Sequence, residues 1–215
     1  MTALTCTPQA RVTRSLLGYG VLAGPVYVLV SLTQALTRDG FDLRRHAWSL
    51  LSNGSLGWLQ ITNFLLAGLM VGAFAVGLRR ALGSTAAPVL VGAYAVSLVA
   101  AGVFRADPML GFPPGTPAGP GTVTWHGVAH LAAGAIGFSC LAAACFVLGR
   151  RFAREGARGW AAYSIATGAV LLVGFGSVAG SGGQVWANLA FTAAIVLTWT
   201  WLSVLSVHLY TEHAK

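Results

Sequence analysis

Charged side chains are scarce in this sequence. Of 215 residues, 13 are Lys or Arg and only 5 are Asp or Glu, so 8% are charged, whereas a soluble domain usually has about 25%. So few charges cannot cover a globule that faces water, and the 56% hydrophobic content indicates a surface that faces a bilayer. The composition excludes ordinary soluble domains and predicts a single integral membrane domain.

Cysteines and acidic residues are also few. The three cysteines, Cys6, Cys140 and Cys145, do not form a disulfide framework, and the last two lie in an apolar run, where a free cysteine behaves as a small buried hydrophobe. The shortage of acids leaves a net charge of +8. Because the basic residues lie at the ends of apolar runs, membrane topology and lipid phosphates account for them, and we expect no nucleic-acid partner.

Long apolar runs dominate what is present, and each is close to the roughly 20 residues that cross a hydrocarbon core. The first run is long enough to be a retained helix, because no small-residue cleavage site follows a short apolar core. The pattern predicts an all-α membrane protein with tails at 1–14 and 210–215. The six spans are expected at about 15–36, 57–78, 87–104, 124–148, 160–180 and 185–209.

The basic residues predict the orientation of this bundle. Nine lie at one set of span ends and four at the other, and the basic-rich side of a membrane protein faces the cytoplasm. Both termini are therefore expected in the cytoplasm, and the two long loops outside it. The nine are Arg11, Arg14, Arg79, Arg80, Arg150, Arg151, Arg154, Arg158 and Lys215; the four are Arg38, Arg44, Arg45 and Arg105.

The two long outer loops differ in composition. In residues 37–56, Asp42 is a plausible N-cap and Asn53-Gly54 a plausible helix stop, with apolar residues on one face between them. This pattern predicts a short amphipathic helix at the interface or over the bundle. The other loop, residues 105–122, is rich in Pro and Gly, which predicts irregular structure.

The most specific pattern is a pair of histidines, His126 and His130, at the start of the fourth span. Two histidines four apart on a helix can offer nitrogens to one metal ion, which makes a divalent metal a candidate cofactor. The intervening residues lack the glutamate of the metalloprotease motif, so hydrogen bonding across helices and proton transfer are alternatives. Haem is disfavoured because no second histidine lies at a matching depth. The third metal ligand would come from Asp107, Asp39, Asp42 or His46.

Other polar and aromatic residues gather at the same outer ends of the spans. Asp107 follows Arg105 by two residues and is either a helix-ending ion pair or an acid/base carboxylate. Trp48, Trp58, Trp125 and Trp186 form either an interfacial belt or a wall around a hydrophobic ligand. The candidate catalytic residues are Asp107, His126 and His130, and these are also the candidate metal ligands. The candidate ligand-binding residues are Arg44, Arg45, His46, Trp58, Gln60, Asn63, Arg105, Trp125 and Asn188.

Two segments carry a resemblance to a known family. The stretch GYGVLAGPVYVLVSLTQALTRDGFDLRRHAWSLLSNGSLGWLQITNF, and FRADPMLGFPPGTP followed by WHGVAHLAAG, resemble the bacterial six-helix membrane family catalogued as domain-of-unknown-function 998. The resemblance covers nearly the whole chain. It implies the six-helix architecture and a multi-pass protein of the bacterial inner membrane, and it leaves the activity open.

Three functions remain compatible with the sequence. The first is a pocket outside the cytoplasm that binds, and acts on, a lipid-like or prenyl-type molecule by acid/base or metal-assisted chemistry. The second is a non-catalytic accessory, assembly or sensing protein. The third, a small transporter, is disfavoured because the centres of the spans carry no acid. Glycine pairs such as Gly20/Gly24, Gly68/Gly72 and Gly176/Gly180 favour close helix packing and do not decide the oligomeric state.

Overall fold

The computed structural model describes residues 8–181 and 183–213, so Cys6 and the first seven residues of the expected tail lie outside the described residues. Within these ranges the protein is all-helical, and six helices are long and apolar enough to cross a membrane. The predicted six-helix membrane architecture is confirmed. The elements are α1 (Pro8–Thr37), the 3-10 helix η1 (Trp48–Ser52), α2 (Gly57–Leu82), α3 (Ala86–Val103), α4 (Trp125–Arg154), α5 (Arg158–Gly180) and α6 (Val185–Glu212).

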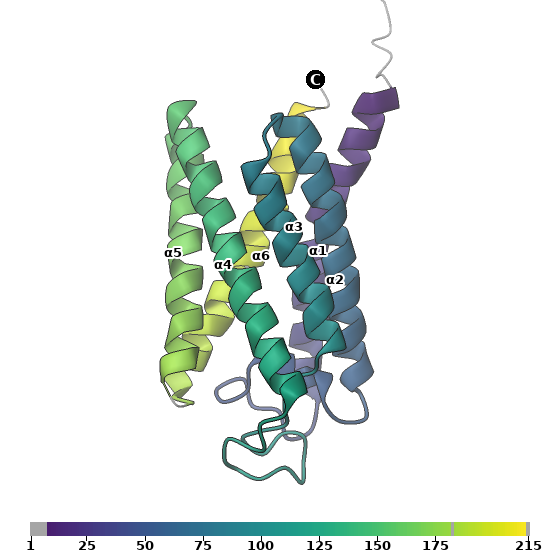
Figure 1. Ribbon diagram of the computed structural model, residues 1–215, viewed down its shortest axis with the longest axis vertical. Coiled ribbons are helices and arrows are strands. Elements are labelled where there is room, and N and C mark those ends of the chain that lie inside the picture. The colour runs from purple at the N-terminus through teal and green to yellow at the C-terminus, as the bar shows by residue number, and fades with distance from the viewer. Residues whose placement is uncertain (1–7, 182, 214–215) are drawn as a thin grey trace, which may run out of the picture.

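The six long helices form a ring in chain order. Each packs against the next helix in the sequence, and α1 packs against α6 to close the ring (Figure 1). The start of α1 and the end of α6 lie at one end of the bundle, which we call the termini end. The two long loops lie at the opposite end, which we call the loop end (Figure 1).

Glycines allow the backbones to approach closely at several points of this ring. A Cβ atom on Gly24 would lie 2.7 Å from the carbonyl oxygen of Trp199 in α6, and one on Gly68 would lie 2.9 Å from that of Ala95 in α3. By contrast, a Cβ on Gly176 or Gly180 would meet no atom within 4 Å. Two of the three glycine pairs therefore pack inside the bundle, as small residues do between membrane helices.

Helices α4 and α5 are not parallel. They lie together toward the termini end, where a Cβ atom on Gly149 of α4 would be 3.3 Å from the carbonyl oxygen of Ala161 in α5. Toward the loop end they separate (Figure 1). The candidate site lies in the region where they separate.

The first long loop folds inward. Its helix is the five-residue η1, which is shorter than the stretch expected between Asp42 and Asn53. Trp48, Leu50 and Leu51 are buried against α1 and α2. The Asp42 side chain accepts a hydrogen bond from the backbone N–H of Arg44 (2.8 Å) and so stabilises a turn ahead of η1.

Candidate ligand-binding site

Two adjoining cavities lie between the helices at the loop end. The deeper one, here called the inner chamber, has a volume of about 140 Å³. The outer one, here called the vestibule, has a volume of about 350 Å³ and lies beneath the two long loops. Ser49, His130 and Leu131 belong to the lining of both, together with Ala47 and Val178, so the junction between the cavities lies at these residues.

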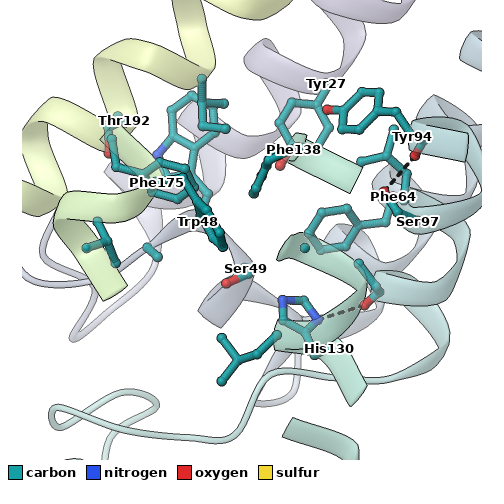
Figure 2. Close-up of a pocket in the computed structure, with 18 residues that line it drawn as sticks. Tyr27, Trp48, Ser49, Phe64, Tyr94, Ser97, His130, Phe138, Phe175 and Thr192 are labelled. Atoms are coloured by element: carbon teal, nitrogen blue, oxygen red, sulfur yellow. Dashed lines mark hydrogen bonds between the residues drawn. The ribbon is translucent and has the colours of Figure 1, made fainter. Parts of the chain in front are cut away.

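The inner chamber has an aromatic wall and no charged side chain in its lining. Phe138 of α4, Phe175 of α5 and Phe191 of α6 are in mutual contact, with ring centroids 5.1 to 5.8 Å apart. These contacts span the region where α4 and α5 separate, and Figure 2 shows Phe138 and Phe175 on this side of the chamber. The other aromatic lining residues are Tyr27, Trp48, Phe64 and Tyr94.

His130 is the buried polar residue at the junction, with 7% of its surface exposed. Its Nδ1 atom lies 2.8 Å from the carbonyl oxygen of Phe104 and 3.2 Å from that of Ala101. These carbonyls are at the C-terminal end of α3, where helix carbonyls lack helical partners. Because a carbonyl oxygen only accepts, Nδ1 carries the hydrogen, and neutral imidazole then leaves Nε2 as an acceptor.

The free nitrogen of His130 faces the cavity. In Figure 2 the bonded nitrogen points toward α3 and the other points toward the side of Ser49. Nε2 has no hydrogen-bond partner among the described residues. The His130 side chain can therefore accept a hydrogen bond from a bound molecule, or act there as a base.

His126 does not join His130 at the cavities. It is exposed and lies against the neighbouring Trp125, with ring centroids 3.6 Å apart. In the part of the chain that the structure describes, no three His, Cys, Asp or Glu side chains gather as a possible metal site. His126, His130 and Asp107 are therefore not arranged to hold a metal ion together.

Asp107 lies in the vestibule wall but has a structural partner. Its carboxylate accepts hydrogen bonds from the backbone N–H (2.8 Å) and the hydroxyl (2.6 Å) of Thr124. Thr124 is the N-cap of α4 and accepts a hydrogen bond from Gly127 N–H (3.2 Å). Arg105 is exposed and forms no ion pair with Asp107 within residues 8–181 and 183–213. Asp107 thus stabilises the first turn of α4.

His46 and Asn188 connect the loops to the helices. Nδ1 of His46 accepts a hydrogen bond from Asp42 N–H (2.9 Å), and its Nε2 donates to the carbonyl oxygen of Leu110 (3.0 Å) in the Pro-rich loop. The Asn188 amide of α6 donates to the carbonyl oxygens of Leu43 (2.8 Å) and His46 (3.2 Å). Both His46 nitrogens are occupied, so this residue fixes the loops and has no free nitrogen for a ligand.

Gln60 and Asn63 lie in a buried polar network between α1 and α2. Oε1 of Gln60 accepts a hydrogen bond from the Gln34 amide (2.9 Å), and the Asn63 amide donates to Ser31 Oγ (3.1 Å) and to the carbonyl oxygen of Tyr27 (3.1 Å). Neither residue lines either cavity. Their amide nitrogens and Gln60 Oε1 pair with protein groups, which lowers the cost of burying them in a membrane, whereas Asn63 Oδ1 has no hydrogen-bond partner among the described residues.

Comparison with known proteins identifies the family to which this chain belongs. The family described as "Protein of unknown function (DUF998)" matches residues 21–208, which includes parts of all six helices and both long loops. The chain belongs to the DUF998 family. Neither a curated protein nor a solved structure matches it. The family resemblance is confirmed. Because the family has no described function, a function for this DUF998 protein has to be argued from the geometry of its two cavities.

The remaining predicted binding residues of this DUF998 chain lie at its surface. Trp58 and Trp125 are exposed on membrane-spanning helices, as expected of an interfacial belt. Arg44 is exposed and lines neither cavity, whereas Arg45 lines the vestibule. Trp48, for which the sequence left open an interfacial belt or a wall around a ligand, is only 6% exposed and lines the inner chamber.

Sequence reasoning missed the role of Arg38. Its guanidinium donates hydrogen bonds to the carbonyl oxygens of Leu51 and Asn53, and its Cζ lies 4.9 Å from the centroid of the Phe112 ring. Burial lowers the pKa of this guanidinium, but an arginine remains protonated in a protein. Arg38 therefore joins the end of α1 to both long loops. The sequence feature that could have indicated this role is a single arginine placed directly after the first span.

Proposed function

We propose that this multi-pass membrane protein binds a lipid-like molecule whose apolar part occupies the inner chamber and whose polar part lies toward the vestibule. The observation that carries the proposal is the junction at His130 between an uncharged aromatic chamber and a vestibule that includes Arg45 and Asp107. Ligand sites commonly combine a mostly apolar concavity with a few placed polar groups. The two cavities have this composition.

The ligand would reach the chamber from the bilayer. Leu131 lines both cavities, yet 66% of its surface is exposed on the membrane-spanning α4. An exposed residue in a cavity wall lies at the rim of an opening.

Two functions are compatible with such binding: the protein changes the bound molecule chemically, or it binds the molecule without changing it. His130 is the residue in a position to act as a base, through its free Nε2. The second candidate function, a non-catalytic accessory or sensing protein, is favoured by the many loop-end polar groups that are already paired within the protein, as at His46 and Asn188. Binding of a hydrophobic ligand is common to both.

We also propose that the loop end faces away from the cytoplasm in a bacterial inner membrane. The support is the excess of Arg and Lys in the segments predicted to be cytoplasmic, nine against four in the sequence; of the nine, Lys215 lies outside the described residues. A reporter that is active only in the cytoplasm, fused after Lys215, should be active, and a reporter in the Pro-rich loop should not. The reverse pattern would overturn the orientation.

Photolabelling tests the binding proposal. The purified protein in nanodiscs is irradiated with a small alcohol whose apolar part, of about one ring, carries a diazirine and fits the chamber of about 140 Å³. Labelling of peptides that contain Phe138, Phe175 or Phe191 should be saturable and should be competed by the unlabelled alcohol. Labelling that rises linearly with the probe and resists competition would reflect lipid-facing contacts only and would overturn the proposal.

A cavity-filling variant sharpens this test. Gly134 lines the inner chamber, and a Cβ atom there would meet only the edge of Phe138 at 3.8 Å, so Gly134→Leu should fill part of the chamber. Gly92→Leu is the matched control, because a Cβ on Gly92 meets no atom within 4 Å and Gly92 lines neither cavity. We expect the saturable labelling to fall at least fivefold in Gly134→Leu only. An equal effect in both variants would contradict the assignment of the chamber.

A further inference from the structure

The two polar groups at the junction define the chemical class of the ligand, an inference that rests on the binding function proposed above. We infer that the ligand is a neutral molecule with a hydroxyl group, which lies between His130 and Ser49 while an apolar part of about one ring occupies the inner chamber. The hydroxyl donates to Nε2 of His130 and accepts from the hydroxyl of Ser49.

The donor requirement follows from His130. Its Nδ1–H is held by the carbonyl oxygens of Phe104 and Ala101, so the ring cannot turn without losing both bonds. Nε2 therefore presents a lone pair to the cavity. A ligand carbonyl or carboxylate at this point would place one acceptor against another, whereas a hydroxyl supplies the missing hydrogen.

The acceptor requirement follows from Ser49. Figure 2 shows Ser49 on the side of His130 to which the free nitrogen points. The Ser49 carbonyl accepts a hydrogen bond from Ser52 (2.7 Å), but the Ser49 hydroxyl has no partner among the described residues. A ligand hydroxyl is both donor and acceptor, so it can pair with both groups at once.

Charge and volume restrict the rest of the ligand. The chamber lining contains no Asp, Glu, Lys or Arg, so a charged group inside it would have no counter-ion and would be costly to bury. Its volume of about 140 Å³ is close to that of a cavity of about 150 Å³ that holds a benzene molecule. The chamber therefore fits one ring or one short branched segment beside the hydroxyl.

Fluorine NMR of two small probes tests this inference. Para-fluorophenol and fluorobenzene differ by the hydroxyl, and each is titrated into nanodiscs with and without the protein to subtract partition into lipid. We expect para-fluorophenol to bind roughly tenfold more tightly than fluorobenzene, the effect of one buried hydrogen bond. His130→Phe should abolish this preference and keep fluorobenzene binding, whereas His126→Phe, the matched control on the exposed side of α4, should keep the preference.

The outcomes separate the inference from the binding function. Equal affinity of both probes for the wild type would overturn the hydroxyl inference and leave the apolar binding function standing. Binding of neither probe above empty nanodiscs would overturn both. If His130→Phe does not fold, Ser49→Ala decides, since it should reduce the preference at least twofold and leave fluorobenzene affinity unchanged; an unchanged preference would overturn the inference.

Discussion

The carboxylate of Asp107 and Thr124 are joined by two hydrogen bonds, from the Thr124 backbone N–H at 2.8 Å and from its hydroxyl at 2.6 Å. Thr124 in turn caps α4 through Gly127 N–H. A Cβ atom on Gly127 would lie within 3 Å of all the carboxylate atoms, so only glycine leaves room for this arrangement. Asp107, which the sequence analysis named as a candidate catalytic residue, therefore stabilises the first turn of α4, the helix that carries His130.

The Asp107→Ala variant should loosen this turn. Loss of the carboxylate removes both acceptors of Thr124 and a negative charge at a helix N-terminus, which together cost about 1 kcal/mol of stability. Hydrogen exchange at the amides of residues 125–128 should accelerate, while exchange in the middle of α4 should not. Asp39→Ala is the control, because Asp39 is exposed. Unchanged exchange in Asp107→Ala would refute the capping role.

Removing the Arg38 side chain should detach the two long loops from α1. Arg38→Met deletes the hydrogen bonds to the carbonyl oxygens of Leu51 and Asn53 and the contact with Phe112, for a loss of about 2 kcal/mol. The readouts are the midpoint of thermal unfolding in detergent and proteolysis within residues 38–56. Arg44→Met, at an exposed position of the same loop, should leave both unchanged. If the two variants behave alike, Arg38 is not a structural anchor.

Gly24→Ala should destabilise the α1–α6 contact. The added methyl group would lie 2.7 Å from the carbonyl oxygen of Trp199 and closer still to Ser203, and relieving such crowding typically costs 1–3 kcal/mol, here about 2. Gly176→Ala, where a Cβ meets nothing within 4 Å, should unfold at an equal or slightly higher temperature, because alanine favours a helix. An equal loss in both variants would contradict this packing.

Gln60→Leu should lower stability without changing the ligand preference. The substitution leaves the Gln34 amide without its Gln60 partner inside the membrane, which costs about 1–2 kcal/mol. Unfolding in detergent measures the loss. Fluorine NMR then measures the affinity for para-fluorophenol, which should match that of the wild type. A selective loss of affinity at unchanged stability would return Gln60 to the binding site.

The six spans could be predicted because each needs only its own continuous apolar residues. The partners of polar residues could not. His126 and His130 are four apart on one helix, yet His126 lies in the exposed first turn and His130 lies one turn deeper against the carbonyl oxygens at the end of α3. That difference depends on where α3 ends relative to α4, which periodicity does not encode.

The same reason applies to the first long loop. The apolar residues around Trp48 fit either a helix at the interface or a helix over the bundle, and the sequence pattern alone left both open. Burial of Trp48, Leu50 and Leu51 depends on the anchors provided by Arg38 and Asn188, which are distant along the chain. The inner chamber was missed for this reason, since its wall combines this loop with residues of all six long helices.

The order of the helices in the ring has a consequence for how the protein is made. Helix α6 is synthesised after α1, with which it forms the closing contact, so the face of α1 around Gly24 lacks its partner until α6 has been inserted. Phe191 and Ile195, which line the inner chamber, arrive on that same last helix. The chamber therefore stays incomplete until α6 has been inserted, and ligand binding can begin only after that step.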